Sequence, residues 1–273
     1  MNHRIGHTVV FLNGDRFPGL ETEEIIRQEK AVPLKIAFYG DSLTEAKTGA
    51  SFFEILRKKL PEHRLINHGR GGDTVISLFR RIVRQRLTQP VDVAFLWVGV
   101  NDVLVHVSWK FPIVKWLSRK PWARDAAEFA KYYRSILDIL CLSARTIYAV
   151  SPLCIGEDLG NPWNRQLDGL GDTIKTVSST HENVEYIDVK ETLASKMADE
   201  NISDYILHSL VRVTLDAFLL NTDEKIDDRS SMRDLQFTLD GVHLNSRGAS
   251  IVADVFYREI NAWLSRHTEY VDA

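Results

Sequence analysis

The sequence predicts an α/β fold in which parallel strands are covered by helices on both faces. Short, almost continuously apolar segments alternate with longer segments of helical periodicity, and this alternation is typical of βαβ units. Strands that are apolar along their whole length are expected to be buried on both faces, as in a parallel sheet. With 273 residues, of which 44% are apolar, the chain can form one substantial core.

The first βαβ unit is predicted from residues 34–67. Residues 34–39 are apolar and form a buried strand that ends at Gly40. A helix follows near residues 51–60, and residues 64–67 form a short second strand.

The middle of the sheet is predicted from the most apolar segment, residues 92–98. A helix over about 74–87 leads into this third strand, and an amphipathic helix over 123–141 follows it. One face of the second helix carries Ala126, Ala130, Tyr133, Leu137 and Leu140. Residues 145–150 form the fourth strand.

The C-terminal part supplies the last strand and two helices. A helix is expected near 164–180, followed by the fifth strand at 184–188. The last helix covers about 246–264. Its apolar stripe consists of Val252, Val255, Phe256, Ile260, Trp263 and Leu264.

Five such strands fit a three-layer α/β/α sandwich around a flavodoxin-like, parallel five-stranded sheet. In sheets of this kind, ligands bind at the carboxyl ends of the strands. Ser42, Gly72 and Asn101 each follow a predicted strand within a few residues. We therefore expect these three residues to meet at one edge of the sheet.

We expect a main domain, residues 34–273, and an N-terminal extension, residues 1–33, that packs on it. The extension is expected to form a hairpin turned at Asn13-Gly14 and a helix near Glu21–Lys30. The main domain carries two insertions, near 103–124 and 189–238.

The second insertion contains a segment, 203–220, that has apolar residues on too many sides for a surface helix. We expect a helix that is buried within the same chain, and a subunit contact in a homo-oligomer is the alternative. Residues 221–234 are rich in acidic residues and serine, and they are expected to form an exposed loop that leads to Asp240.

Four short motifs occur in one order along the chain and hold the groups that serine acyl chemistry needs. They are Gly40-Asp41-Ser42-Leu43, Gly71-Gly72-Asp73-Thr74, Gly99-Val100-Asn101-Asp102 and Asp240-Gly241-Val242-His243. Ser42 is the candidate nucleophile, and a serine hydroxyl needs a base to remove its proton. His243 is the candidate base, because Asp240 can orient one ring nitrogen and leave the other facing Ser42.

The motifs also supply candidate donors for an oxyanion. The glycines at 71 and 72 let the backbone approach a substrate closely, so that the Gly72 N–H can point at the developing charge. The Asn101 side-chain amide and the Ser42 N–H are the other candidates. Each motif alone also fits a turn or a helix cap, and only their ordered combination favours catalysis.

These motifs resemble the four blocks of the SGNH (GDSL) hydrolase superfamily, and the resemblance covers most of residues 34–264. It implies the SGNH hydrolase fold and hydrolysis of an acyl or acetyl ester. The residues carried over by motif are Ser42, Asp240 and His243 as the catalytic triad and Ser42, Gly72 and Asn101 as the oxyanion hole. Gly72 is chosen over its neighbouring glycines because Asp73-Thr74 follow it. The remaining motif aspartates, Asp41, Asp73 and Asp102, are expected to hold the loops.

The insertion at 103–124 is a candidate substrate-binding region. It begins directly after Asn101, and it contains aromatic and basic residues but no acidic ones. Trp109 and Phe111 are favoured as substrate-binding residues in a rim or lid. The lysines are favoured as solvated charges, and simple aromatic packing is the alternative.

Composition excludes several other classes of protein. A net charge of −3 gives no reason to expect nucleic-acid binding, and the apolar run from Val93 to Val100 is too short for stable membrane insertion. With only Cys141 and Cys154, and with no clustered metal ligands, no disulfide, metal or cofactor is expected. The N-terminus has no recognisable secretion signal, so a cytoplasmic protein is expected.

The leading function is therefore a serine esterase that acts on a small-molecule carboxylic ester. An acyltransferase with the same triad is the nearest alternative. A non-catalytic, flavodoxin-like binding module is another, because glycines at strand ends can also bind anions.

Overall fold

The computed structural model describes residues 33–108, 110–197, 203, 205–206, 216, 218–220 and 222–268. The hairpin and helix predicted for the N-terminal extension, and its packing on the main domain, lie outside the described residues. Trp109 also lies outside them.

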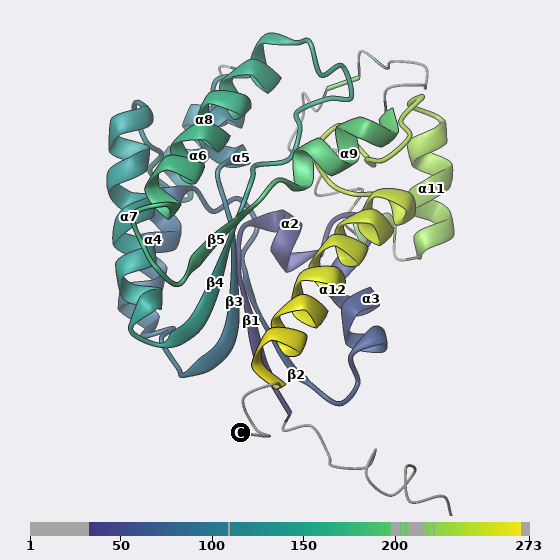
Figure 1. Cartoon of the computed structure of the whole chain (residues 1–273). Helices are drawn as coiled ribbons and strands as arrows, with labels where there is room; N and C mark the ends of the chain where they lie inside the picture. Colours follow the sequence, from purple (N-terminus) through teal and green to yellow (C-terminus); the bar gives the residue numbers. More distant parts are fainter. Residues whose placement is uncertain are drawn as a thin grey trace, which may run out of the picture. The chain divides into compact units, whose positions relative to one another are not determined.

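Within the described residues, five parallel strands form one sheet in the order β2-β1-β3-β4-β5 (Figure 1). The strands are β1 (Lys35–Gly40), β2 (Arg64–Gly69), β3 (Val91–Trp97), β4 (Ala144–Val150) and β5 (Val184–Ile187). The predicted α/β fold with a parallel five-stranded sheet is thus confirmed. The strand order reverses between β1 and β3, and in such sheets the reversal opens a crevice at the carboxyl ends of the two strands.

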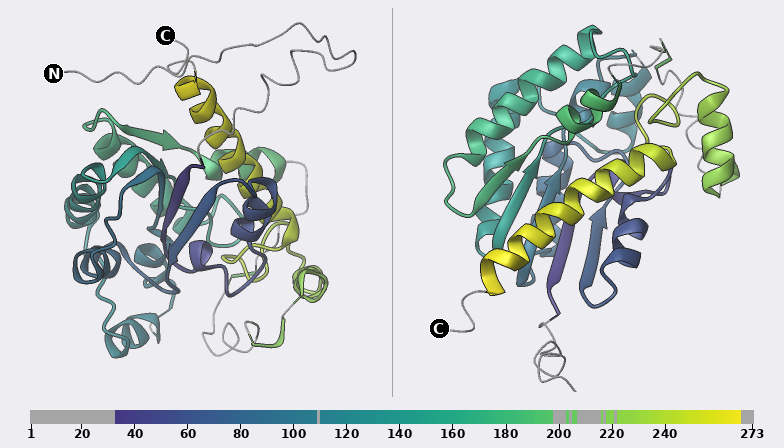
Figure 2. Two further views of the ribbon diagram at one scale, coloured as in Figure 1. Left: turned by 90° about the horizontal axis from the view of Figure 1, so that it is seen from below. Right: turned by 45° about the vertical axis from the view of Figure 1, so that its right-hand side comes forward.

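Helices cover both faces of the sheet. On one side α3 (Phe52–Lys59) packs against α12 (Ser246–Thr268). On the other side α7 (Ala126–Cys141) lies between α4 (Val75–Gln85) and α8 (Pro162–Ser178). The right-hand view of Figure 2 shows α12 running along its face of the sheet. The three layers are those expected from the alternation of strands and helices.

An aromatic cluster joins the sheet to the layer of α3 and α12. Phe38 on β1 stacks on Phe95 on β3, with ring centroids 4.8 Å apart. Phe256 on α12 lies 4.7 Å from Phe95 and 5.2 Å from Phe52 on α3. These four rings are fully buried, and burying side chains of this size is a main source of folding free energy.

A short helix, α2 (Ser42–Glu45), starts immediately after β1 and packs on the end of β2. Contact is so close that a Cβ at Gly69 would lie 2.1 Å from the Glu45 nitrogen, and only glycine fits there. The Asn67 side-chain amide donates to the Thr44 carbonyl at 2.7 Å. The first turn of α2, which carries Ser42, is therefore held against the sheet.

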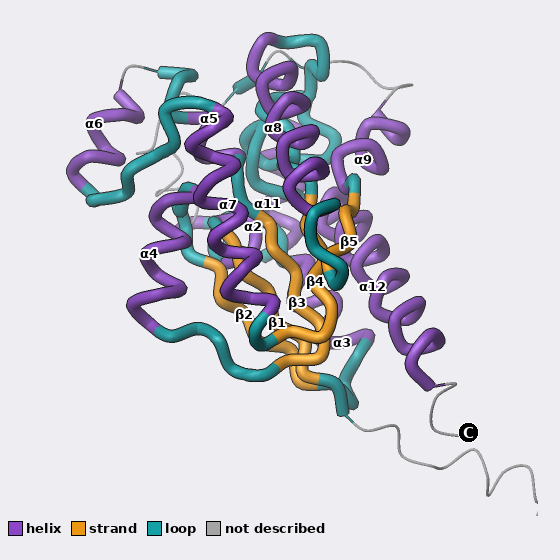
Figure 3. The backbone as a smooth tube through the Cα atoms, turned by 60° about the vertical axis from the view of Figure 1, so that its left-hand side comes forward, coloured by secondary structure: helices purple, strands orange, loops and turns teal. Residues whose placement is uncertain are grey.

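The first insertion folds back on the end of the sheet. It begins within α5 (Val100–Leu104) and contains α6 (Lys110–Leu117), and Figure 3 shows both helices at the end where the chain leaves the strands. Near its end, the Ala123 N–H donates to Asp102 Oδ1 at 3.1 Å. The insertion thus leaves the sheet and returns to it beside the same motif.

The second insertion differs from the prediction in two respects. Residues 221–234 are not a loop, because α11 (Asp223–Ser231) occupies most of this range. Thr222 caps the helix by accepting a hydrogen bond from the Lys225 N–H at 3.4 Å, and the acidic first turn suits the positive end of a helix. Buried Ile226 anchors it.

Most of the helix predicted over 203–220 lies outside the described residues. Residues 203, 205 and 206 are not helical, whereas residues 216, 218 and 219 are. Burial was expected along this segment, but Phe218 is 82% exposed and Leu219 is 54% exposed. The expectation of burial is therefore wrong for these two residues.

Candidate active site

In the first motif, Gly40-Asp41-Ser42-Leu43, Asp41 makes hydrogen bonds in two directions. Its Oδ1 accepts a hydrogen bond from the Leu43 N–H at 3.0 Å and so caps α2. Its Oδ2 accepts from the Asn101 side-chain nitrogen at 3.2 Å. A carboxylate only accepts hydrogen bonds, so this contact fixes which end of the Asn101 amide faces Asp41. One buried carboxylate therefore joins the end of β1 to the end of β3.

In the fourth motif, Asp240-Gly241-Val242-His243, Asp240 also uses both carboxylate oxygens. Oδ1 accepts hydrogen bonds from the backbone N–H groups of Val242 and His243, at 3.1 and 2.8 Å. Oδ2 lies 2.8 Å from His243 Nδ1. Because an ionised carboxylate has no proton to donate, Nδ1 carries the proton and Nε2 carries the lone pair.

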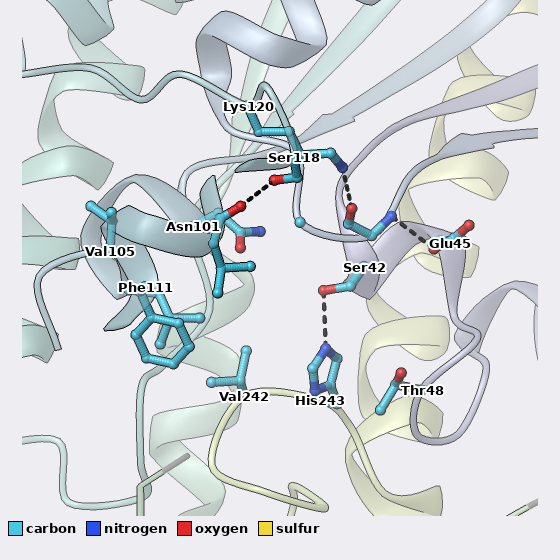
Figure 4. A pocket seen from close by; sticks show the side chains of 14 residues that line it. Ser42, Glu45, Thr48, Asn101, Val105, Phe111, Ser118, Lys120, Val242 and His243 are labelled. Carbon is cyan, nitrogen blue, oxygen red and sulfur yellow. Dashed lines mark hydrogen bonds between the residues drawn. The ribbon is translucent and has the colours of Figure 1, made fainter. Parts of the chain in front are cut away.

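The two motifs meet at the end of the sheet (Figure 4). His243 Nε2 lies 3.0 Å from Ser42 Oγ, although the residues are 201 positions apart in the sequence. With the lone pair on Nε2, the imidazole can accept the serine proton. Ser42, His243 and Asp240 thus form a continuous chain of two hydrogen bonds.

Burial and charge act in opposite directions on this pair. His243 is 5% exposed and Asp240 is 1% exposed. Burial lowers the pKa of the His243 imidazole, but the charge and hydrogen bond of Asp240 outweigh burial and raise that pKa above 6.5. Burial likewise raises the pKa of the Asp240 carboxyl, and His243 with the two backbone donors brings it below its ordinary value. Each of the two residues therefore stabilises the charged form of the other.

The second motif brings Gly72 to the same cavity. Gly72 has φ +72°, a conformation that glycine adopts without strain. The Gly71 N–H donates to Glu45 Oε2 at 2.7 Å, and the Gly71 carbonyl accepts from Lys120 Nζ. In a trans peptide the N–H points opposite to the C=O, so the Lys120 contact also sets the direction of the Gly72 N–H.

Lys120 is not a solvated charge, contrary to expectation for the lysines of this insertion. Its ammonium lies 3.0 Å from Asp73 Oδ1, and Arg81 Nε donates to Asp73 Oδ2 at 2.7 Å. Asp102 accepts from the Val75 N–H at 2.9 Å. The motif aspartates hold the surrounding loops, in agreement with the sequence-based expectation.

Glu157 is a buried residue that the sequence did not single out. Its Oε1 accepts from the Phe237 and Thr238 N–H groups at 2.9 and 2.8 Å and from the Thr238 hydroxyl at 2.8 Å. Its Oε2 accepts from the Gln236 N–H at 2.7 Å. This carboxylate therefore holds the segment that leads to Asp240. The only available signal was a pair of acids, Glu157 and Asp158, a few residues after the apolar fourth strand.

These groups surround a cavity of about 300 Å³. It is lined by Ser42, Glu45, Thr48, Gly71, Gly72, Asn101, Leu104, Val105, Phe111, Val114, Ser118, Lys120, Val242 and His243. Phe111 is therefore placed where the sequence suggested a substrate-binding residue. All the predicted site residues that the structure describes lie at this cavity, except Asp240, which stands behind His243.

In the described part of the chain, no group of three or more His, Cys, Asp and Glu side chains could hold a metal ion. None of the helices formed by the described residues is long and apolar enough to cross a membrane. Cys141 and Cys154 are both free thiols.

Comparison with known proteins identifies the family. Residues 38–251 match the model of the GDSL-like Lipase/Acylhydrolase family. Because this match spans most of the chain, the protein belongs to that family, and it is a carboxylic ester hydrolase. A comparison with curated proteins gives no match.

Solved structures share the fold. The acetyl xylan esterase AlAXEase is 21% identical with a TM-score of 0.58, over 83% of this chain and 100% of that chain. Axe2, an acetylxylan esterase from Geobacillus stearothermophilus, is 21% identical with a TM-score of 0.59, over 84% and 95% of the two chains. LAE5, an alpha/beta hydrolase enzyme from the metagenome of Lake Arreo, Spain, is 18% identical with a TM-score of 0.58, over 83% and 94%.

Proposed function

We propose that this protein is a serine esterase that cleaves an acyl or acetyl ester with Ser42, His243 and Asp240 as its catalytic triad. The observation that carries the proposal is the pair of hydrogen-bonding distances on the two sides of one imidazole. His243 Nε2 lies 3.0 Å from Ser42 Oγ, and Nδ1 lies 2.8 Å from Asp240 Oδ2. A nucleophile, its base and the group that orients the base stand in the geometry that nucleophilic catalysis requires.

In the acylation half of the reaction, Ser42 Oγ attacks the ester carbonyl while His243 Nε2 takes the hydroxyl proton. Asp240 stabilises the imidazolium that forms, and its effect on the pKa of His243 acts in that direction. When the tetrahedral intermediate collapses, His243 gives the proton to the leaving alcohol oxygen. The products of this half are an acyl ester of Ser42 and the free alcohol.

The negative oxygen of the tetrahedral intermediate needs donors that are already in place. We assign this role to the Ser42 N–H, the Gly72 N–H and the Asn101 side-chain amide, all of which belong to residues that line the cavity. The Asn101 amide is held by Asp41, and the Gly71–Gly72 peptide is held by Lys120 and Glu45. Such preorganised donors act without reorganising during the reaction.

In the deacylation half, water takes the place of the alcohol. His243 accepts a proton from the water as its oxygen attacks the acyl carbon, and the second tetrahedral intermediate uses the same donors. Collapse returns the proton to Ser42 Oγ and releases the carboxylic acid. The scheme uses only protein groups and water, and it requires no cofactor.

The direct test compares two serines that line the same cavity. Ser42→Ala should reduce hydrolysis of p-nitrophenyl acetate by about 10⁴-fold or more, since the triad acts as a unit. Ser118→Ala is the matched control, because Ser118 lines the cavity but donates to the Val114 carbonyl at 2.7 Å. It should retain activity within a few-fold. Near-normal turnover by Ser42→Ala would overturn the assignment.

A further inference from the structure

The cavity beside Ser42 has a polar side and an apolar side (Figure 4). Glu45, Thr48 and Lys120 supply the polar side. The apolar side is made of Leu104, Val105, Phe111, Val114 and Val242. Such a division suits a ligand with one polar end and one hydrocarbon end.

The apolar side is a wall of packed, mostly buried side chains. Leu104, Val105, Phe111 and Val242 are each buried, at most 6% exposed. Their side chains carry no hydrogen-bonding atoms. A hydroxyl-rich group placed against them would lose its hydrogen bonds to water and gain none, which is costly.

Most of this wall comes from the first insertion. Phe111 and Val114 lie three positions apart on α6, so they share one side of that helix. Phe111 is buried, Val114 is 40% exposed, and both line the cavity. The helix α6 therefore supplies a buried part and a partly exposed part of the apolar side.

We propose that the apolar side is a subsite for an aliphatic acyl chain longer than acetyl. The inference rests on the proposed serine esterase function, since it places the chain relative to Ser42. The natural substrate class is then esters of aliphatic carboxylic acids. Acetyl esters fill only the part of the cavity next to Ser42.

The placement of the acyl chain follows from where the alcohol must leave. The leaving oxygen takes a proton from His243 Nε2, so the alcohol lies beside that ring. In Figure 4, Thr48 lies on one side of His243, whereas Val242 and Phe111 lie on the other. We therefore place the alcohol on the Thr48 side, where a hydroxyl is available, and the acyl chain against the hydrocarbon side.

The first experiment measures kcat/KM for p-nitrophenyl esters from acetate to octanoate. With an apolar subsite, kcat/KM should rise by about fourfold per added methylene until the subsite is full, because burying one CH₂ contributes about 0.8 kcal/mol. A profile that is highest for acetate would overturn the subsite.

Two neighbouring residues of α6 provide a matched pair of variants. Val114→Trp should fill part of the apolar side and lower the ratio of kcat/KM for octanoate to kcat/KM for acetate by at least tenfold. Ile113→Trp is the control, because Ile113 is 48% exposed and does not line the cavity. It should keep the natural profile. Equal effects of the two variants would contradict the proposal.

A second series separates the acyl side from the alcohol side. For acetates of ethanol, butanol and octanol, kcat/KM should change little with chain length. A rise along this series, with acetate preferred as the acyl group, would overturn the placement of the chain.

Failure of the subsite can be told apart from failure of the proposed function. If Ser42→Ala abolishes hydrolysis but acetate is the preferred ester, the esterase assignment stands and the acyl subsite is wrong. If hydrolysis does not depend on Ser42, both are wrong.

Discussion

Lys120 and Gly71 are in direct contact in the lining of the cavity, with the lysine ammonium donating to the glycine carbonyl. The same ammonium is 3.0 Å from Asp73, so its position is fixed from two sides. Because the Gly72 N–H belongs to the same peptide as the Gly71 carbonyl, Lys120 governs the direction of a proposed oxyanion donor. A side chain from the first insertion thereby orients the Gly71–Gly72 peptide of the second motif.

The first prediction concerns this contact. Lys120→Met should lower kcat by about tenfold to 10³-fold with a smaller change in KM, since an oxyanion donor acts mainly in the transition state. Lys120→Arg should recover part of kcat. Lys59→Met is the control, because Lys59 pairs with Asp254 at the surface and neither residue lines the cavity. Steady-state kinetics on a soluble p-nitrophenyl ester would show this, and an unchanged kcat in Lys120→Met would refute the role.

The second prediction concerns Asn101. Removing its amide in Asn101→Ala should cost about 2.7–4 kcal/mol of transition-state stabilisation, or 10²–10³-fold in kcat. Substrate affinity should change much less. If KM rises instead and kcat is preserved, Asn101 binds the ground state and is not an oxyanion donor.

The third prediction is a dependence of kcat/KM on pH. Protonated His243 cannot accept the Ser42 proton, so activity should rise as pH increases through the pKa of His243. Because Asp240 raises that pKa, the midpoint of the rise should lie above pH 6.5. Asp240→Asn removes the charge that opposes burial, so the midpoint should move to lower pH, and kcat should fall by about 10⁴-fold.

A histidine that does not line the cavity provides the control for this profile. His181 lies 3.1 Å from Asp138, away from the cavity. His181→Gln should leave the midpoint where it is. A midpoint at or below pH 6.5 in the natural protein would argue against the Asp240–His243 pairing.

The fourth prediction concerns Glu157, which holds residues 236–238 in front of Asp240. Glu157→Gln should lower the free energy of unfolding by about 1–3 kcal/mol, because a buried amide replaces one acceptor with a donor that faces backbone N–H groups. It should also lower kcat, since residues 236–238 lead to Asp240, which orients His243. Glu185→Gln, which breaks an ion pair with Arg266 at the surface, should do neither. Chemical unfolding and kinetics together would test this.

The sequence predicted the sheet and the meeting of Ser42, Gly72 and Asn101 because both follow from local patterns. Apolar segments give the strands, and the carboxyl ends of parallel strands lie at one edge. His243 does not directly follow a predicted strand, so its contact with Ser42 was expected from the ordered combination of the motifs and their resemblance to the SGNH superfamily. Only the turn at Asp240 is local, because Asp240 accepts hydrogen bonds from N–H groups two and three residues away.

Contacts between loops could not be predicted in the same way. Lys120 reaches Gly71 only because the first insertion folds back beside Asp102, and no periodic pattern indicates that return. Glu157 meets its partners about 80 positions further along the chain. The helix at Asp223–Ser231 was missed because acidic residues and serine were taken as a sign of a loop, although acids in a first turn stabilise a helix.

The central claim is that Ser42 is a nucleophile activated by His243. The most direct measurement is mass-spectrometric mapping of the adduct formed with a fluorophosphonate probe, which reacts with activated serines. We expect one adduct, on Ser42, that is lost in Ser42→Ala and strongly slowed in His243→Ala. No labelling of the natural protein, or the same labelling in Ser42→Ala, would contradict the account.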